Sequence, residues 1–387
     1  MKELPRIIVL VPALASYCRG LLRGIARYSR LHGPWSFFNE RGEPDEVLPL
    51  LKNWNANGII TYFDTSENLH KLLPPDLPAV IVTTNAEIPG YPNVIGDWKN
   101  ESCTAVEYFL NAGFRNFAYC SFSNLEWSQI RAKYFAERLK AEGIEPALYE
   151  KPFLFLHKHW KREQEELADW LVSLPKPVAV MACNDERGKH VLEACKIAEL
   201  VVPEQVAVLG VDNDETICEL TQPPLSSISV NAEKAGYEAA EVLDRMMQGR
   251  PGPYENVVVQ TLGVKARQST DIFMIEDETV ARALSYIRMN SKRFIQVDEV
   301  AEAAAIHRRG LERRFKKHLG RSVHEEIRRA RLEEIKKLLL ETNLLVSQIA
   351  LRLNFSEVPH LTRFFTRETG TSPNEFRKQH LGNLKSL

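Results

Sequence analysis

Short, continuous runs of apolar residues alternate with amphipathic helical segments from residue 6 to about residue 267 of this 387-residue chain. The runs are rich in Val and Ile and comprise residues 6–12, 57–63, 79–84, 117–122, 178–183 and 206–212. Strands without polar alternation are covered on both faces, and strands that alternate with helices form parallel sheets. A segment of this length predicts an α/β fold with two doubly wound lobes.

The last third of the chain has a different composition, with long amphipathic helices rich in Arg, Lys, Glu and Leu. Residues 1–270 hold 28 Lys and Arg against 35 Asp and Glu, a net charge of −7, whereas residues 271–387 hold 22 against 16, a net charge of +6. We therefore predict domains 1–270 and 271–387, joined by a linker near residues 266–276. A basic domain behind an acidic one indicates a polyanionic partner for the basic domain alone.

Two segments of the basic domain, residues 297–328 and 346–377, repeat one plan. In each, an apolar helix is followed by a turn, a second helix that ends in Phe, and a Gly-x-Ser stop. The small Ala301 and Ala350 allow two helices to cross closely, as in a helix-turn-helix unit. The expected cores of the two units contain the pairs Val300 and Ile349, and Phe315 and Phe365. The basic domain is therefore predicted to be all-α, with two helix-turn-helix units.

The second helix of each unit, residues 307–317 and 356–368, is expected to enter a major groove of double-stranded DNA. The candidate DNA-binding residues are Arg308, Arg309, Arg313, His360, Thr362 and Arg363. An Arg can read guanine, hold a phosphate or belong to a solvated basic face, and these alternatives stay open for each Arg. A helix over residues 322–342 would separate the units by about 30 Å, close to one DNA turn of ~34 Å.

In parallel α/β folds a ligand binds beyond the carboxyl ends of the strands. The candidate ligand-binding residues at such positions are Tyr17, Asp97, Trp127, Arg131, Asn184, Asp185 and Asp212. Carboxylates, amides and Arg suit hydroxyl groups, which both donate and accept hydrogen bonds. An indole can lie against the apolar face of a sugar ring. The alternatives are helix capping for Asp and Asn, and a core or hinge role for Trp127.

Two family resemblances extend this interpretation. Residues 182–215 (ACNDERGKHVLEACKIAELVVPEQVAVLGVDNDE) and 223–243 (PPLSSISVNAEKAGYEAAEVL) resemble the sugar-sensing core of the LacI/GalR family, which has a two-lobed, periplasmic-binding-protein-like fold. That resemblance implies sugar contacts for Asp97, Arg131, Asn184 and Asp212. Val230 and Asn231 stand where relatives often carry Gln, which puts that contact in doubt. Residues 361–367 (LTRFFTR) and 369–377 (TGTSPNEFR) resemble the C-terminal signature of AraC-type DNA-binding domains.

A LacI/GalR-type core followed by an AraC-type domain resembles the xylose-responsive transcription activators. This resemblance implies a monosaccharide effector, with D-xylose favoured, an interlobe site, a homodimer, and RNA polymerase as a partner. Another monosaccharide is the alternative effector, and a sugar-acting enzyme or a transporter's solute-binding protein is the alternative class. No dinucleotide, Walker A, zinc-protease or nucleophile-elbow motif is present, so we expect no catalytic residue, cofactor or metal.

The sequence also predicts where the protein acts. Its first residues lack the long apolar core and cleavage site of a signal peptide, and no stretch approaches the ~20 apolar residues of a membrane span. The six cysteines are scattered, which favours a role as small buried hydrophobic residues in a reducing compartment. We therefore expect a cytoplasmic protein without a membrane partner.

Overall fold

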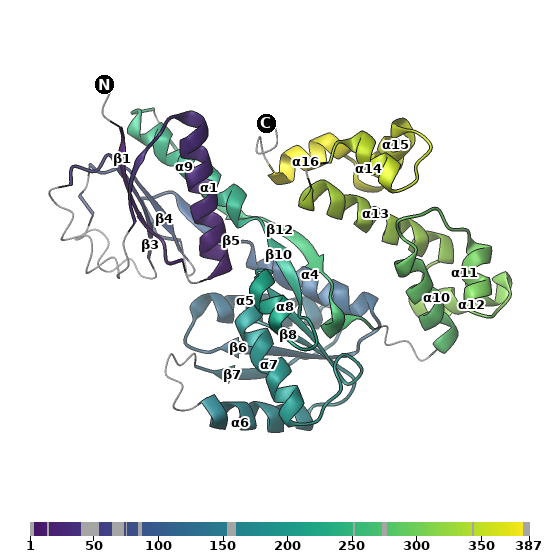
Figure 1. The fold of residues 1–387 in the computed structure, drawn as a ribbon. Helices are drawn as coiled ribbons and strands as arrows, with labels where there is room; N and C mark the ends of the chain where they lie inside the picture. Colours follow the sequence, from purple (N-terminus) through teal and green to yellow (C-terminus); the bar gives the residue numbers. More distant parts are fainter. Residues whose placement is uncertain are drawn as a thin grey trace. The chain divides into compact units, whose positions relative to one another are not determined.

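The computed structural model describes residues 4–13, 15–39, 54–63, 73–74, 76–83, 87–152, 160–250, 252–272, 277–342 and 344–381. The chain divides into two compact units. One contains residues 1–107 and 115–271, and the other contains residues 108–114 and 272–387. Both β-sheets belong to the first unit, and the second unit is helical. Figure 1 shows the order of the elements along the chain.

The first lobe is built on a six-stranded, wholly parallel sheet in the order β11-β5-β4-β3-β1-β2. Its strands are β1 (Arg6–Leu10), β2 (Ser36–Phe38), β3 (Gly58–Tyr62), β4 (Ala79–Val82), β5 (Asn93–Gly96) and β11 (Val257–Val259). The helices α1 (Ser16–His32) and α9 (Ala232–Met247) pack side by side on one face of this sheet (Figure 1). Along the sequence, the chain therefore returns to the first lobe, at α9 and β11, only after most strands of the second lobe.

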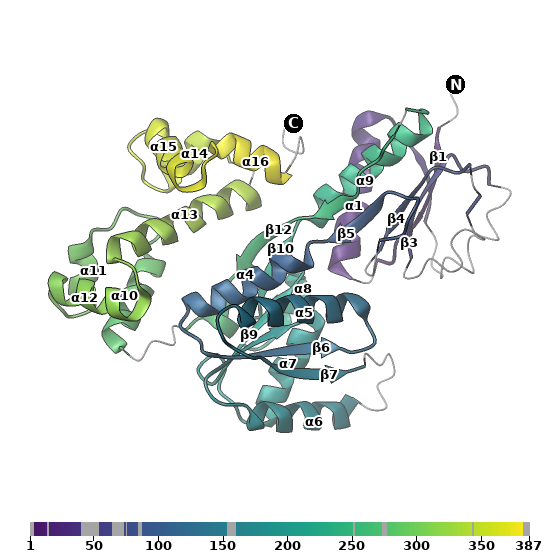
Figure 2. The ribbon, with the colours of Figure 1, turned by 180° about the vertical axis from the view of Figure 1, so that it is seen from behind.

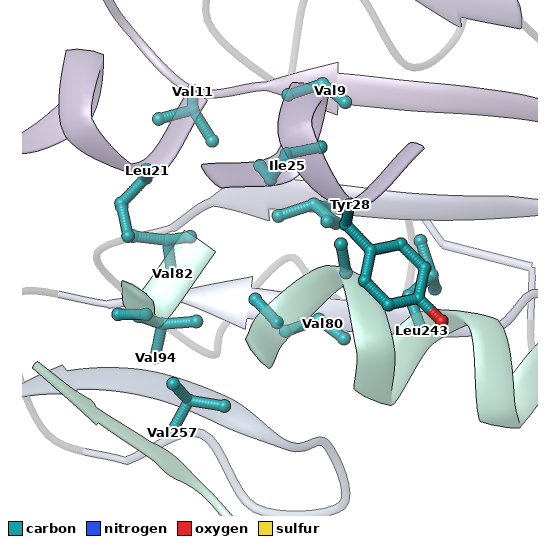
Figure 3. Packing of buried hydrophobic residues seen from close by; sticks show 14 of the residues in the cluster. Val9, Val11, Leu21, Ile25, Tyr28, Val80, Val82, Val94, Leu243 and Val257 are labelled. Atoms are coloured by element: carbon teal, nitrogen blue, oxygen red, sulfur yellow. The ribbon is translucent and has the colours of Figure 1, made fainter. Parts of the chain in front are cut away.

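Side chains of β1 alternate between the two faces of that sheet. Ile7, Val9 and Val11 enter the core beneath α1 and α9, whereas Ile8 and Leu10 enter the core on the opposite face. Figure 3 shows Val9 and Val11 of the first core with Leu21, Ile25 and Tyr28 of α1, Leu243 of α9, and valines of the neighbouring strands. Burial on both faces is why these strands read as unbroken apolar runs.

The second lobe has a six-stranded sheet in the order β12-β10-β9-β8-β6-β7, parallel except for β12. Its strands are β6 (Asn116–Phe122), β7 (Ala147–Lys151), β8 (Val178–Ala182), β9 (Val206–Val211), β10 (Ser226–Val230) and β12 (Thr261–Lys265). Helices α6 (Trp160–Ser173) and α7 (Asp185–Ile197) cover one face. Helix α5 (Glu126–Lys140) covers the other, where Phe135 packs against Phe117 and Tyr119 (Figure 2). Helices α4 (Trp98–Asn111) and α8 (Glu215–Leu220) follow β5 and β9.

Each sheet contains a point at which the strand order reverses. Strand β1 lies between β2 and β3, and β6 lies between β7 and β8. At such a point the loops after adjacent strands diverge to opposite faces, and a crevice opens at their carboxyl ends. The two lobes predicted from the apolar runs are confirmed, as is the periplasmic-binding-protein-like fold that the family resemblance implied.

The second unit contains α10 (Glu278–Met289), α11 (Val297–Ala303), α12 (Arg308–Leu319), α13 (Val323–Glu341), α14 (Val346–Arg352), α15 (Val358–Thr369) and α16 (Pro373–Leu381). Helices α11 and α12 form the first helix-turn-helix unit, and α14 and α15 form the second. Val300 and Phe315 lie in the core of the first, and Ile349 and Phe365 lie in the core of the second, as predicted. Ala301 and Ala350 are both 3% exposed, which confirms close helix crossings.

The turns of the two helix-turn-helix units share a left-handed residue. Ala305 has φ 54° in the first turn and Asn354 has φ 53° in the second. Asn tolerates this conformation through its short polar side chain, whereas Ala adopts it at a cost of about 1 kcal/mol or more. Gly320 and Gly370 end α12 and α15 with φ of 69° and 77°, so the repeat extends to the helix C-caps.

Among the described helices, none has the length and apolar character needed to cross a lipid bilayer. No cluster of three or more His, Cys, Asp or Glu suited to a metal ion is present within the described residues. Five of the six cysteines are buried free thiols, as predicted, and Cys103 is half-buried. Residues 273–276 of the predicted linker lie outside the described residues.

Candidate ligand site and nucleic-acid interface

All seven candidate ligand residues lie in the segments that follow the carboxyl ends of strands. Tyr17 is in the first turn of α1 after β1, and Asp97 separates β5 from α4. Trp127 and Arg131 belong to the first turns of α5 after β6. Asn184, Asp185 and Asp212 follow β8 and β9. Tyr17 is therefore helical.

Arg131 and Glu101 form a buried ion pair at the centre of this region. The Nη2 and Nε atoms of Arg131 lie 2.6 Å and 2.8 Å from Oε2 of Glu101, and their side chains are 6% and 3% exposed. Burial raises the pKa of the Glu101 carboxyl, and the guanidinium of Arg131 opposes that rise. Glu101, which fixes Arg131 in place, was not among the residues predicted from the sequence.

Two further contacts hold the guanidinium of Arg131. It donates through Nη1 to the carbonyl oxygen of Cys183, at the end of β8. The ring of Trp127, one turn earlier on α5, has its centroid 5.3 Å from the guanidinium carbon. A guanidinium has five N–H groups, so two remain after these three hydrogen bonds. Arg131 is thus a rigid donor, and the ring of Trp127 contacts its cation.

Asp212 ends strand β9 in a strained conformation. Its φ is 99°, and the next residue, Asn213, has φ 50°, both in the region that favours glycine. Such outliers concentrate at functional sites, because the surrounding structure has to impose them. Burial raises the pKa of Asp212 to about 7, with the Arg131 guanidinium opposing and the Glu101 and Asp214 carboxylates adding to the rise. Asp212 is therefore within electrostatic reach of the Arg131–Glu101 pair.

Tyr17 comes to the same region from the first lobe. Burial raises the pKa of its phenol well above the usual value, and Cys18, Asp212 and Glu101 act in the same direction. The phenol of Tyr17 is therefore neutral, and it interacts electrostatically with the carboxyl group of Asp212. The two lobes are also joined by an ion pair, since Arg19 Nη2 of α1 lies 2.6 Å from Asp214 Oδ2. Tyr17 and Asp212 thus lie close together although different sheets carry them.

Asn184, Asp97 and Asp185 have structural partners as well. Asn184 caps α7 through Oδ1, which accepts from the amide of Arg187 at 2.9 Å, and Asp97 accepts from the amide of Asn100 at 3.3 Å. Asp185 is 2% exposed, and its two oxygens accept from Ser227 Oγ at 2.5 Å and from the Asp214 amide at 2.6 Å. The capping alternative therefore applies to Asn184 and Asp97, whereas Asp185 supports the loop that carries Asp212 and Asp214.

Asn231 stands where the resembling family often has Gln. Its Oδ1 accepts from the amide of Lys234 at 3.3 Å, and it forms the N-cap of α9. The residue is 6% exposed. Its side chain therefore starts the helix that returns the chain to the first lobe.

Helix α12 presents a row of exposed basic side chains. Arg308 is 3.2 Å from Asp298, and Arg314 pairs with Asp277, the N-cap of α10. Arg309 and Arg313 are exposed and have no ion pair or hydrogen bond to another described residue. These two cations are consequently available to a nucleic acid without first breaking a protein contact.

Helix α15 repeats the burial pattern of α12, with Leu361 and Phe365 inward. Arg363 is exposed at the position that Arg313 holds in α12, and its Nε donates to the carbonyl of Pro359 in its own helix, at 3.4 Å. His360 bonds Ser356 Oγ at 2.6 Å, and the hydroxyl of Thr362 donates to the carbonyl of Val358 at 3.1 Å. Of these three candidates, Arg363 has the longest and weakest hydrogen bond to the protein, so its guanidinium is the most readily available to DNA.

Helix α13 connects the two helix-turn-helix units and contributes to both cores. Val323 is buried in the first core, with Ile327 against it, and Ile335 and Leu339 are buried in the second. Its 19 residues follow the N-cap Ser322, which forms a capping box with Glu325. The predicted helix over residues 322–342 is therefore confirmed, and it gives the two recognition helices a common support.

Comparison with known proteins agrees with this architecture. The model of a periplasmic binding protein-like domain matches residues 106–270, and that of a helix-turn-helix domain matches residues 300–379. The "Xylose operon regulatory protein" of Escherichia coli (strain K12) is 29% identical over 380 residues, 96% of both chains. That of Haemophilus influenzae (strain ATCC 51907) is 27% identical over 383 residues, 96% of this chain and 98% of the relative.

A solved structure extends the similarity to three dimensions. The "xylose-binding transcription activator xylR" matches with a TM-score of 0.61 and 28% sequence identity, over 98% of this chain and 99% of that one. The fold and the helix-turn-helix pair define a DNA-binding transcription regulator, not an enzyme, with a periplasmic-binding-protein-like domain ahead of an AraC-type domain. Over nearly its whole length, this regulator is a homologue of the xylose operon regulatory proteins.

Proposed function

We propose that this regulator switches pentose-utilisation genes in response to D-xylose, which binds between the two lobes of residues 1–270. Full-length similarity to a xylose-binding activator supports this proposal, because both the effector unit and the DNA-binding unit are matched in one chain. The observation in the molecule that carries it is the rigid Arg131, held by Glu101 beside Asp212 at the carboxyl ends of the strands.

The chemistry of the candidate residues suits a small polyol. Arg131 keeps two N–H donors for hydroxyl oxygens, whereas Asp212 and Asp97 supply acceptors for hydroxyl protons. The phenol of Tyr17 and the carboxamide of Asn184 can each donate or accept a hydrogen bond. The half-buried Trp127 offers apolar surface to the ring of a sugar. We infer that Asp185 contributes indirectly, by holding the loop of Asp212, since both of its oxygens already accept hydrogen bonds.

The proposed switch links the sugar site to residues 271–387. A ligand that contacts both lobes favours the state in which they are closed, and it can shift the equilibrium only by its preference for that state. A coupling free energy of about 1–3 kcal/mol between sugar and DNA would suffice. We propose that closure changes the placement of two DNA-binding domains in a homodimer, and that the bound dimer activates transcription through RNA polymerase in the cytoplasm.

Calorimetric titration of the purified chain with D-xylose tests the effector, with L-arabinose, D-ribose and D-glucose as comparisons. We expect saturable xylose binding near micromolar Kd, about −8 kcal/mol, and weak or absent heat with the others. The Asp212→Ala variant should lose xylose binding while it retains the DNA affinity of the sugar-free protein. A stronger response to another sugar would replace xylose as the effector. No heat with any of the four would refute a pentose effector.

A further inference from the structure

The side chain of Arg267 connects three parts of the second lobe. It stands two residues after β12, and its side chain is 7% exposed. Nη2 donates to Oδ1 of Asn213 at 2.9 Å, Nη1 donates to the carbonyl of Leu225 at 2.9 Å, and Nε lies 2.7 Å from Oε1 of Glu219. Its three nitrogens thus have acceptors on the loop after β9, on the segment before β10, and on α8.

The first of these acceptors belongs to the strained loop at the candidate sugar site. Asn213 follows Asp212, and both residues have positive φ. The backbone amide of Asn213 donates to Ser227 Oγ at 3.0 Å. Asn213 is therefore held through its backbone by Ser227 and through its side chain by Arg267. A displacement of Asp212 therefore reaches Arg267 through one peptide bond and the short side chain of Asn213, with no other residue in between.

The residues after Arg267 are anchored to the same lobe by buried hydroxyls. Ser269 donates through Oγ to the carbonyl of Val208 at 2.6 Å and accepts from the amide of Ser226 at 2.8 Å. Thr270 lies 2.7 Å from Ser226 Oγ, and Arg267 itself bonds Ser226 Oγ through its amide at 2.7 Å. Ser269 and Thr270 are 0% and 2% exposed. These are the last residues of the first unit before the chain continues into the helical unit.

We propose that Arg267 is a positioning residue that transmits occupancy of the sugar site to the start of the linker. The guanidinium is planar and rigid, so it cannot follow Asn213 and keep its bonds to Leu225 and Glu219 unchanged. A ligand that shifts Asp212 and Asn213 must therefore rearrange Arg267 and the hydroxyl-anchored residues 268–270. This mechanism rests on the proposed function, since it needs a ligand on Asp212.

The alternative is that Arg267 only stabilises the lobe, and matched variants of the full chain separate the two roles. Asn213→Gly removes the side-chain carboxamide that accepts from Arg267, and glycine still adopts a φ of 50°. Asn213→Asp keeps an oxygen acceptor at the same place. Arg267→Lys keeps the positive charge but loses the planar guanidinium, which makes three directed hydrogen bonds at once. Lys265→Gln is the control, because Lys265 lies on the same chain segment and pairs with Glu215 of α8 at 2.7 Å, away from Asn213.

The first measurement is the ratio of promoter DNA affinities with and without saturating D-xylose, by fluorescence anisotropy. For Asn213→Gly and Arg267→Lys we expect this ratio to fall at least fivefold towards one, with sugar-free DNA affinity within twofold of wild type. Asn213→Asp and Lys265→Gln should keep the wild-type ratio. An unchanged ratio in folded Asn213→Gly and Arg267→Lys would overturn the proposal.

The second measurement needs no sugar. Amide hydrogen exchange of residues 268–271 in the sugar-free protein should accelerate at least tenfold in Asn213→Gly, but not in Lys265→Gln. If wild type does not respond to D-xylose while this acceleration is present, the xylose assignment fails and the Asn213–Arg267 link stands. Unchanged exchange in Asn213→Gly would refute the link, whatever the sugar response.

Discussion

Arg131 and Glu101 are more than nine-tenths buried, and their charged atoms approach to 2.6 Å. Removing one member of such a pair leaves the other charge desolvated and uncompensated, which typically costs about 3–5 kcal/mol. The pair is therefore a structural requirement of the site as well as its source of donors. Because Glu101 comes from α4 and Arg131 from α5, the pair also joins two helices of the second lobe.

Glu101→Gln should lower the free energy of unfolding of the first unit by about 3 kcal/mol. All six tryptophans precede residue 271, so their fluorescence during urea unfolding reports on that unit alone. The matched control is Glu107→Gln on the same helix, since Glu107 is 60% exposed and 4.0 Å from Arg138. Equal destabilisation by both substitutions would contradict a special role for the buried pair.

Asp212 should make stability depend on pH. Its folded pKa of about 7 lies above its unfolded value, so the native state holds a proton that the unfolded state releases between about pH 4 and 7. The stability contributed by this group is therefore complete below pH 4 and lost as the pH rises through 7. Asp212→Asn removes the titration, and we expect it to raise the free energy of unfolding at pH 8 by up to about 4 kcal/mol.

Urea unfolding of Asp212→Asn and wild type from pH 4 to pH 8 measures this difference, again by tryptophan fluorescence. The two proteins should have nearly equal stability at pH 4 and diverge towards pH 8. Asp169→Asn is the control, because Asp169 is exposed on α6 of the first unit, and the substitution should change stability by less than about 0.5 kcal/mol. A constant difference across the range would mean that Asp212 does not titrate there.

The sequence predicted most of the central strands and the helix-turn-helix pair, whereas the ligand site stays a prediction. Continuous apolar runs such as residues 178–183 have one physical explanation, burial on both faces. Strands β2, β7, β10, β11 and β12 were not predicted. Four of them are edge strands, which are short and partly exposed; β7 (Ala147–Lys151), for example, buries only Tyr149. The fifth, β10 (Ser226–Val230), lies inside its sheet but has Ser at three of its five positions, so it does not form an apolar run. The sequence of these segments does not indicate which strand each one pairs with, because that depends on the neighbouring strand already present in the sheet.

Single buried charges were beyond sequence reasoning for a related reason. Glu101 stands in a polar helix start and Arg331 in a run of basic residues, where each reads as a solvated side chain. Their burial, 2% and 4% exposed, comes from tertiary contacts with α5 and with the second helix-turn-helix turn. Asp185 was selected as a ligand contact because its position after a strand is the same whether it binds a ligand or supports a loop.

Arg331 lies between the two helix-turn-helix units. Its guanidinium carbon is 4.3 Å from the ring centroid of Phe294, which precedes α11, and 4.2 Å from that of Phe355, in the second turn. Its Nη2 donates to the carbonyl of Leu353 at 2.6 Å, and burial lowers its pKa to about 10. No carboxylate compensates the desolvation of this guanidinium within the described residues.

We therefore expect Arg331→Ala to destabilise the helical unit by about 3 kcal/mol, since it opens a cavity between two aromatic rings. Arg331→Met fills that space without a buried charge and should change stability by less than about 1 kcal/mol. The measurement is urea unfolding followed by helical circular dichroism, with Lys337→Met, on the exposed face of α13, as the control. Equal loss in the Ala and Met variants would show that the polar contacts of Arg331 dominate.

The two exposed arginines at equivalent positions, Arg313 of α12 and Arg363 of α15, should contribute to DNA binding in the same way. Neither pairs with an acid among the described residues, whereas Arg308 must release Asp298, 3.2 Å away, before it can bind DNA. We expect Arg313→Ala and Arg363→Ala each to weaken promoter binding by about 1–3 kcal/mol, and Arg308→Ala to weaken it less.

Salt titrations of these variants between about 50 and 200 mM distinguish what each side chain contacts. Loss of a phosphate contact lowers the slope of log affinity against log salt by about 1 and weakens all sequences alike. Loss of a base contact leaves the slope nearly unchanged and relaxes specificity at one base pair. Arg282→Ala, on α10 outside both helix-turn-helix units, is the matched control. If it weakened binding as much as Arg313→Ala and Arg363→Ala, the basic charge of the whole unit, and not its recognition helices, would account for binding.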